Sequence, residues 1–168
     1  MKVTMITAGV LGLLLLPGCA GVPQSLPDRP ARLPHGYVYY LDGAGGGSAI
    51  RNWSGGVRDG LLAAGYPGAG EMFTWETGLG APADQAASVG YKRQKAAELA
   101  DHIRAYRAGY PHAPVNIIGL SAGTAIVAFV LEELPEDCPV DNVVLLGASI
   151  GADYDLTQAL KRVRNRLY

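Results

Sequence analysis

The sequence predicts an α/β fold in which a mostly parallel sheet is covered by helices on both faces. Runs rich in β-branched or aromatic residues alternate with helical patterns four times, which requires parallel strands joined by crossover connections. Hydrophobic residues make up 49% of the chain and charged residues only 17%, a balance that suits buried parallel strands. The length of 168 residues fits one domain with a substantial core.

Each predicted strand has residue types that favour a pleated, buried segment. The strands are expected at Tyr37–Asp42, Glu71–Trp75, Val115–Leu120 and Val140–Leu146. The first is aromatic and β-branched, and the last two are short apolar runs beside proline or glycine.

The predicted helices show apolar residues every three or four positions. They are expected from about Ser48 to Ala64, as one long helix from Asp84 to Tyr106, from Thr124 to Leu134, and from about Asp155 to the end. Asp155 would cap the last helix, whose apolar face would carry Leu156, Leu160, Val163 and Leu167. Its solvated face would carry Lys161, Arg162, Arg164 and Arg166.

Residues 1–18 have the features of a signal peptide rather than of the fold. Lys2 supplies a positive charge, and residues 8–16 form an apolar segment too short to span a bilayer. Leu16-Pro17-Gly18-Cys19 resembles the lipobox of bacterial lipoproteins, in which the cysteine is lipidated. The resemblance implies an anchor at Cys19 in the bacterial cell envelope, in the outer membrane if the cell is Gram-negative. An ordinary secretory signal cleaved close by is the alternative.

Residues 19–35 are interpreted as a proline-rich tether, so that the folded domain would cover residues 36–168. The segment has no periodic pattern and carries Pro23, Pro27, Pro30 and Pro34. Lipidation of Cys19 would leave Cys138 as the second of two cysteines, without a partner for an intramolecular disulfide. Cys138 is interpreted as an incidental thiol.

The segment around Ser121 is the strongest functional signal. Gly119-Leu120-Ser121-Ala122-Gly123 lies between a predicted buried strand and a predicted buried helix. A strand that turns directly into a helix around one serine is the geometry of a nucleophile elbow, and the two glycines allow the strand and helix to cross closely.

A second glycine-rich segment, Asp42-Gly43-Ala44-Gly45-Gly46-Gly47, follows the first strand. A phosphate cradle is one interpretation, but the segment lacks the Lys-Ser/Thr pair of a P-loop and does not match G-x-G-x-x-G in register. An oxyanion loop, which aims a backbone N–H at a reacting carbonyl, is the other. The second is favoured because the elbow supplies a nucleophile.

Together these segments resemble the α/β-hydrolase family over nearly all of residues 37–168. Residues 42–46 are similar to the H-G-x-G-G pattern of esterases and lipases, with Asp42 where that pattern often has histidine. The resemblance implies that Ser121 is the nucleophile and that the backbone N–H groups of Ala44 and Ala122 form the oxyanion hole.

The sequence departs from the family in its acid and base. The family places both after the nucleophile, but no histidine follows Ser121, and His102 and His112 are expected on the surface at the opposite end of the sheet. Asp153 or Asp155 lies where a minority of relatives have their acid. The chain would also end directly after a helix, where the pattern predicts another strand. We therefore expect the hydrolase-like domain to be incomplete at its C-terminal end.

Two functional classes stay open at this point. One is a serine hydrolase that acts on a small-molecule or lipid acyl ester or thioester, nearly inactive in this chain for want of a base. The other is a non-catalytic, membrane-anchored envelope lipoprotein that uses a hydrolase fold for binding. A net charge of -1 gives no electrostatic reason to expect nucleic acid, the cysteines and histidines show no metal-ligand spacing, and no cofactor is expected.

Overall fold

A parallel sheet forms the centre of the fold, as predicted, but the described residues contribute five strands to it rather than the four expected. The computed structural model describes residues 25–47 and 53–168, so the predicted signal peptide, Cys19 and the predicted helix start at Ser48 lie outside the described residues. The strands lie in the order β2-β1-β3-β4-β5. They are β1 Tyr37–Leu41, β2 Ala69–Met72, β3 Val115–Leu120, β4 Val140–Leu146 and β5 Val163–Leu167.

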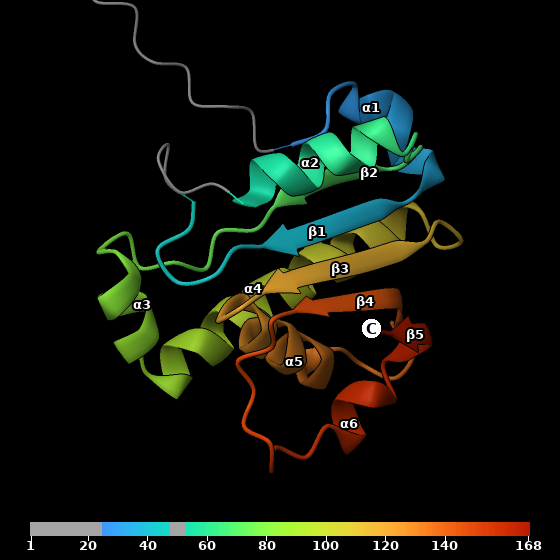
Figure 1. Ribbon diagram of the computed structural model, residues 1–168. Helices are drawn as coiled ribbons and strands as arrows, with labels where there is room; N and C mark the ends of the chain where they lie inside the picture. The colour runs from blue at the N-terminus through green and yellow to red at the C-terminus, as the bar shows by residue number, and fades with distance from the viewer. Residues whose placement is uncertain (1–24, 48–52) are drawn as a thin grey trace, which may run out of the picture.

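Helices cover both faces of the sheet (Figure 1). They are α1 Arg29–Arg32, α2 Trp53–Ala63, α3 Ala81–Ala86, α4 Val89–Gly109, α5 Gly123–Glu133 and α6 Thr157–Leu160, with a 3-10 turn at Leu33–His35. Because successive side chains of a strand point to opposite faces, β1 contributes to two apolar layers. Val38 packs near Val57 of α2 on one face, and Tyr39 belongs to the core formed with α4 and α5 on the other.

The second strand begins two residues earlier than predicted. The predicted strand is Glu71–Trp75, but pairing with β1 covers Ala69–Met72. Phe73 and Trp75 are nevertheless buried, in the loop that follows the strand. These aromatic residues are buried without being paired in the sheet, so their presence indicates burial and not a strand.

The predicted long helix from Asp84 to Tyr106 is two helices, α3 and α4. Ala87 between them has an extended backbone with ψ of 134°. Ser88 then caps α4, and its Oγ accepts a hydrogen bond from the Tyr91 N–H at 3.1 Å. A serine cap satisfies a free amide of the first turn, which is how the new helix starts.

The prediction of a final helix from Asp155 onward is wrong beyond Leu160. The chain forms the short helix α6 and then the edge strand β5, so a strand does follow β4. Val163 and Leu167 are four residues apart, a spacing that places two side chains on one face of a helix and also on one face of a strand. The segment forms a strand because it pairs with the otherwise free edge of β4.

Two of the basic residues predicted on that helix, Arg162 and Arg164, bind groups of other elements. Arg162 Nε donates to the Leu134 carbonyl at 2.8 Å. Arg164 donates to Asp141, a buried carboxylate of β4 that also accepts from Arg107 at 2.7 Å and from the Val115 N–H at 2.8 Å. Asp141 therefore joins β3, β4, β5 and α4 at the amino ends of the strands.

Part of the predicted tether is folded against the sheet. Leu26 is 2% exposed, and its N–H donates to the Gly70 carbonyl at 2.8 Å. Arg29 pairs with Glu71 at 2.9 Å, and Arg32 donates to the Tyr66 carbonyl at 2.6 Å. Within the described part of the chain, no helix is both long and apolar enough to cross a membrane.

Close packing of α5 against β1 and β3 positions the site. A Cβ on Gly123 would lie 2.5 Å from the Asp42 carbonyl oxygen and 3.1 Å from that of Leu41. A Cβ on Gly119 would lie 2.8 Å from Val127 Cγ2 and 3.2 Å from Thr124 Cα. Both distances from Gly123 are to backbone atoms, which cannot rotate away.

We expect Gly123→Ala to lower the free energy of unfolding by about 1–3 kcal/mol, because the added methyl group forces β1 and α5 apart. Urea denaturation measures this. Gly60→Ala is the matched control, since nothing lies within 4 Å of a Cβ at this α2 position. It is expected to raise stability by about 0.5–1 kcal/mol. Unchanged stability of Gly123→Ala would contradict the close crossing.

Candidate active site

Ser121 lies at the sharp turn between β3 and α5, with an exposed side chain. Its φ is 47°, in the left-handed region that costs a non-glycine residue about 1–2 kcal/mol. Two contacts hold this backbone in place. The Ser121 N–H donates to the Leu146 carbonyl at 2.8 Å, and the Thr124 hydroxyl donates to the Ser121 carbonyl at 2.5 Å. The strained backbone that the sequence predicts at an elbow is present.

The glycine-rich loop after β1 lies directly beside Ser121. A Cβ on Gly43 would be 3.1 Å from Ser121 Cβ and 3.7 Å from Ser121 Oγ. The Gly46 N–H donates to the Gly43 carbonyl at 3.0 Å, and Gly45 has a φ of 76°, a combination that defines a type II turn with Ala44 at its second position. The structure thus brings together the two segments that the sequence singled out.

The backbone N–H groups of Ala44 and Ala122 have no hydrogen-bond partner within residues 25–47 and 53–168. Ala122 precedes the first residue of α5, where backbone N–H groups carry the positive end of the helix dipole. Neither N–H is therefore engaged by another group of the described chain.

Two buried carboxylates hold the loop. Asp42 Oδ2 accepts from the Gly47 N–H at 3.0 Å, and the Asp42 carbonyl accepts from the Trp75 indole at 2.8 Å. Asp84 Oδ2 accepts from the Gly45 N–H at 2.7 Å, and its other oxygen accepts from the N–H and hydroxyl of Thr77 at 2.7 and 2.6 Å.

The ionised form of Asp84 is favoured. Burial by itself would raise the pKa of this carboxyl, but the hydrogen bonds from Thr77 and Gly45 outweigh burial and lower the pKa below its ordinary value. Asp84 is therefore a fixed negative charge that ties the glycine-rich loop to the loop after β2. This role is not predicted from the sequence, which places Asp84 at the start of a helix.

Glu76 is the group of this region whose charge changes near neutral pH. Burial raises its pKa to about 7, and the negative charges of Asp42 and Asp84 act in the same direction. Glu76 Oε2 accepts from the Trp75 N–H at 3.0 Å. Its Oε1 is buried without a hydrogen-bond partner in the described chain.

Ser149 is a site residue that the sequence analysis missed. Its Oγ lies 3.5 Å from Ser121 Oγ, and its N–H donates to the Thr124 hydroxyl at 2.9 Å. Ser149 follows the end of β4, the strand next to the elbow strand. Knowledge of the strand order would have placed it here, since the carboxyl ends of adjacent parallel strands lie at the same edge.

A cavity of about 230 Å³ opens in front of Ser121. Its walls are the glycine-rich loop, Leu120, Gln85 and Trp53. Trp75 in the loop after β2 is fully buried core, and Leu79 of the same loop is 81% exposed and lies outside the cavity wall.

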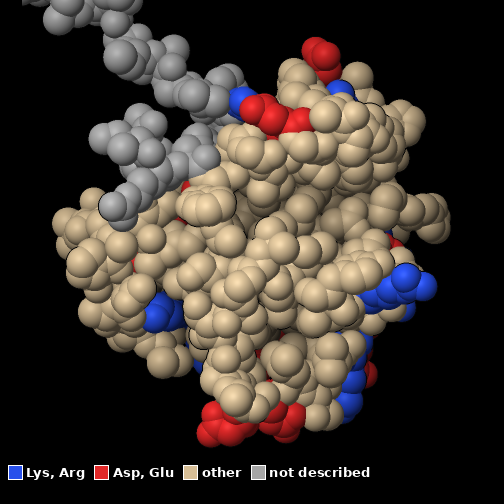
Figure 2. Space-filling model, in the orientation of Figure 1, with Lys and Arg blue, Asp and Glu red and all other residues tan. Residues whose placement is uncertain are grey.

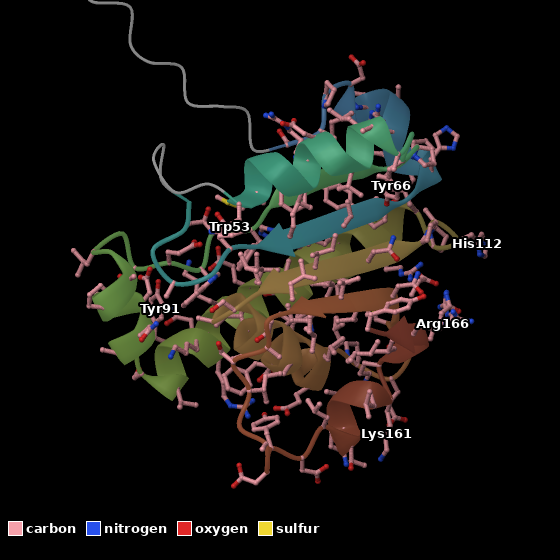
Figure 3. The ribbon with its side chains drawn as sticks, in the orientation of Figure 1. Trp53, Tyr66, Tyr91, His112, Lys161 and Arg166 are labelled. Atoms are coloured by element: carbon pink, nitrogen blue, oxygen red, sulfur yellow. The ribbon has the colours of Figure 1, made fainter. Side chains whose placement is uncertain are left out.

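The predicted acids and the histidines are not joined to Ser121 by any hydrogen bond in the described chain. Asp155 Oδ1 accepts from the Thr157 N–H at 2.8 Å, and hydrogen bonds from Thr157 lower the pKa of Asp155. His102 packs edge-on against Phe73. His112 lies at the other end of β3 from Trp53 (Figure 3).

Neither a metal site nor a reactive cysteine is found among the described residues. Among residues 25–47 and 53–168, no group of three or more His, Cys, Asp and Glu side chains could hold a metal ion. Cys138 is buried, and burial raises the pKa of its thiol, which keeps the sulfur protonated and unreactive.

Comparisons with known proteins identify the fold. No family model and no curated protein matches the sequence. Two solved structures of acetyl xylan esterase match with TM-scores of 0.57 and 0.55, at 15% and 14% identity. One is an iodinated complex at 1.80 Å and the other is at 0.90 Å resolution. Each alignment covers 80% of this chain and 82% of the esterase. The chain therefore shares the parallel α/β fold of these esterases.

Proposed function

We propose that the protein is a serine hydrolase that acts on an acyl ester or thioester, with Ser121 as its nucleophile. The observation that carries the proposal is the left-handed backbone of Ser121, which presents an exposed hydroxyl beside the glycine-rich turn. A strained backbone is retained where the surrounding contacts over-determine it, and such residues concentrate at functional sites. The likeness of the fold to acetyl xylan esterases supports ester chemistry.

In this mechanism Ser121 Oγ attacks the acyl carbonyl and the carbonyl oxygen becomes negatively charged. The N–H groups of Ala44 and Ala122, which have no partner in the described chain, would donate to that oxygen. Each such donor contributes about 3 kcal/mol of transition-state stabilisation. Asp84 and Asp42 hold the loop that carries Ala44, so the donor is in place before the reaction.

In the described part of the chain, no basic side chain is hydrogen-bonded to Ser121 Oγ, so a proton acceptor is lacking there. A serine hydroxyl is a poor nucleophile until a base removes its proton. Ser121 Oγ is paired with Ser149 Oγ, and all three histidines of the sequence lie before Ser121 in the chain. We therefore propose that these 168 residues by themselves hydrolyse an ester negligibly, for want of a base at Ser121.

The second candidate function is a non-catalytic envelope lipoprotein that uses this fold for binding. The specific observation in its favour is the partner of Ser121, which is a serine at 3.5 Å rather than an imidazole. The two functions differ in whether the hydroxyl of Ser121 reacts, and the following experiment separates them.

We expect the 168-residue chain to hydrolyse a p-nitrophenyl ester no faster than its Ser121→Ala variant. Loss of the base from a serine–histidine pair costs on the order of a millionfold in kcat. Added imidazole can take the serine proton from solution, so it is expected to restore nitrophenolate release in the parent chain above the rate of Ser121→Ala. The variant corrects for direct reaction of imidazole with the ester.

Mass spectrometry after treatment with a fluorophosphonate and imidazole locates the reactive group. The adduct is expected on Ser121 and is expected to persist in Ser149→Ala, the neighbouring serine variant. Equal rates for the parent chain and Ser121→Ala at every imidazole concentration, together with no adduct, would favour the binding function.

Ala44→Pro tests the oxyanion donor. Proline removes the N–H but suits the second position of a type II turn, so the loop is expected to keep its shape. The imidazole-dependent rate is expected to fall about 100- to 1000-fold, whereas Ala44→Gly, which keeps the N–H, stays near the parent rate. Thermal melting of both variants checks the fold. Equal rates for the two variants would remove Ala44 from the mechanism.

We also propose that the protein is anchored in the cell envelope through lipidation of Cys19, on the basis of its lipobox-like segment. Stable anchoring needs more than one acyl chain. Cells grown with labelled palmitate are expected to label the parent protein and Cys138→Ser but not Cys19→Ser. An unlabelled, secreted parent protein would support an ordinary signal peptide instead.

A further inference from the structure

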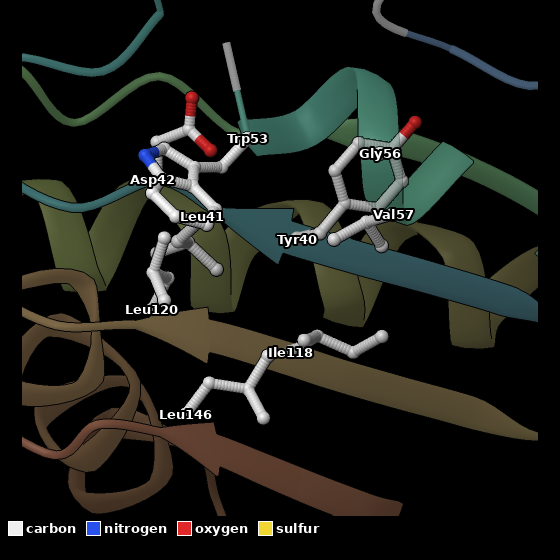
Figure 4. Close-up of a pocket in the computed structure, with 9 residues that line it drawn as sticks. All are labelled: Tyr40, Leu41, Asp42, Trp53, Gly56, Val57, Ile118, Leu120 and Leu146. Atoms are coloured by element: carbon white, nitrogen blue, oxygen red, sulfur yellow. The ribbon is translucent and has the colours of Figure 1, made fainter. Parts of the chain in front are cut away.

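An apolar groove lies between α2 and the neighbouring strands, next to the Ser121 cavity (Figure 4). Its volume is about 270 Å³. The walls are formed by Trp53, Gly56 and Val57 of α2 and by the ends of β1, β3 and β4, with the side chains Tyr40, Leu41, Ile118, Leu120 and Leu146. Trp53 is 65% exposed and Leu146 is 44% exposed, so the groove is open to a ligand.

The groove and the Ser121 cavity are adjacent and share two wall residues. Trp53 and Leu120 line both, and Leu120 directly precedes Ser121. The cavity at Ser121 contains the polar groups of the glycine-rich loop and Gln85, whereas the groove is lined by aliphatic and aromatic side chains. A ligand that occupies both therefore has a polar, reactive end and an apolar remainder.

The chemistry of the groove favours a hydrocarbon chain over a sugar or a peptide. The one charged side chain in its wall, Asp42, is 2% exposed and accepts from the Gly47 N–H. Hydroxyl and amide groups of a ligand would lose their water here without replacement hydrogen bonds. Figure 2 shows the same face of the molecule, with Lys, Arg, Asp and Glu gathered at its margins rather than over the strands.

We propose that this groove binds the alkyl chain of an acyl ester whose carbonyl lies at Ser121, so that the substrate is an ester of a fatty or other extended aliphatic acid. The proposal rests on the proposed function for the placement of the carbonyl. Binding of the chain itself depends only on the groove. Trp53 is then the wall shared by the alkyl chain and the reacting end.

The test measures the affinity of butanoate, hexanoate, octanoate and decanoate by calorimetric or NMR titration of the 168-residue chain. These acids bind without reacting, so the absence of a base does not matter. The Kd is expected to fall up to about fourfold for each added methylene until the groove is filled. Leu146→Asn is expected to weaken octanoate binding roughly tenfold or more, because the amide faces an apolar chain.

Leu160→Asn is the matched control. Leu160 is 49% exposed, close to the exposure of Leu146, but it lies on α6, outside the groove. This variant is expected to bind octanoate like the parent chain. Thermal melting checks that all variants fold.

The outcomes separate this inference from the proposed function. Affinity that does not change with chain length, or equal weakening by Leu146→Asn and Leu160→Asn, overturns the groove while leaving Ser121 reactivity untouched. If affinity rises with chain length but imidazole does not restore hydrolysis, the groove binds alkyl chains as proposed and the proposed serine hydrolase function is wrong. Self-association that is lost in Leu146→Asn and is not displaced by octanoate would assign the groove to a second copy of the chain, which also overturns the inference.

Discussion

The close packing of α5 against β1 and β3 is the constraint on which the rest of the site depends. The Gly123 backbone packs against the carbonyl groups at the end of β1, and that approach leaves room for one residue in a left-handed conformation between strand and helix. Ser121 occupies that position, so its hydroxyl is directed away from the sheet. The same contact places the loop after β1 beside the serine. One packing contact thus sets both halves of the candidate site.

The loop beside Ser121 is held by charge as well as by packing. Asp42 and Asp84 accept hydrogen bonds from backbone N–H groups of the loop, and Asp84 also joins it to Thr77. Anionic acceptors make stronger hydrogen bonds than neutral ones, so Asp42 and Asp84 stabilise the turn at Ala44. In the H-G-x-G-G pattern of esterases and lipases, the position of Asp42 is often histidine. In this chain the Asp42 side chain accepts a hydrogen bond from the Gly47 N–H of the loop.

α2 covers only part of one face of the sheet, which leaves an apolar groove beside the cavity at Ser121. α2 packs over β1, while the same face of β3 and β4 is left partly open at Ile118, Leu120 and Leu146. The polar cavity at Ser121 and the apolar groove meet at Trp53. The proposed nucleophile next to an apolar groove fits the proposed substrate, which has an ester at one end and a hydrocarbon chain at the other.

The sequence alone determined the parallel α/β class, the strands β3 and β4, and the pairing of a serine turn with a glycine-rich loop. These follow from local rules, because a buried strand, a buried helix and the glycines between them leave a pattern in consecutive residues. Tertiary structure decided the rest. Val163–Leu167 became a strand because β4 had a free edge, and Ser149, Asp84 and Trp53 joined the site because the sheet order brings distant loops together. Contacts between residues that are far apart in the chain depend on strand order and packing, which spacing along the sequence does not encode.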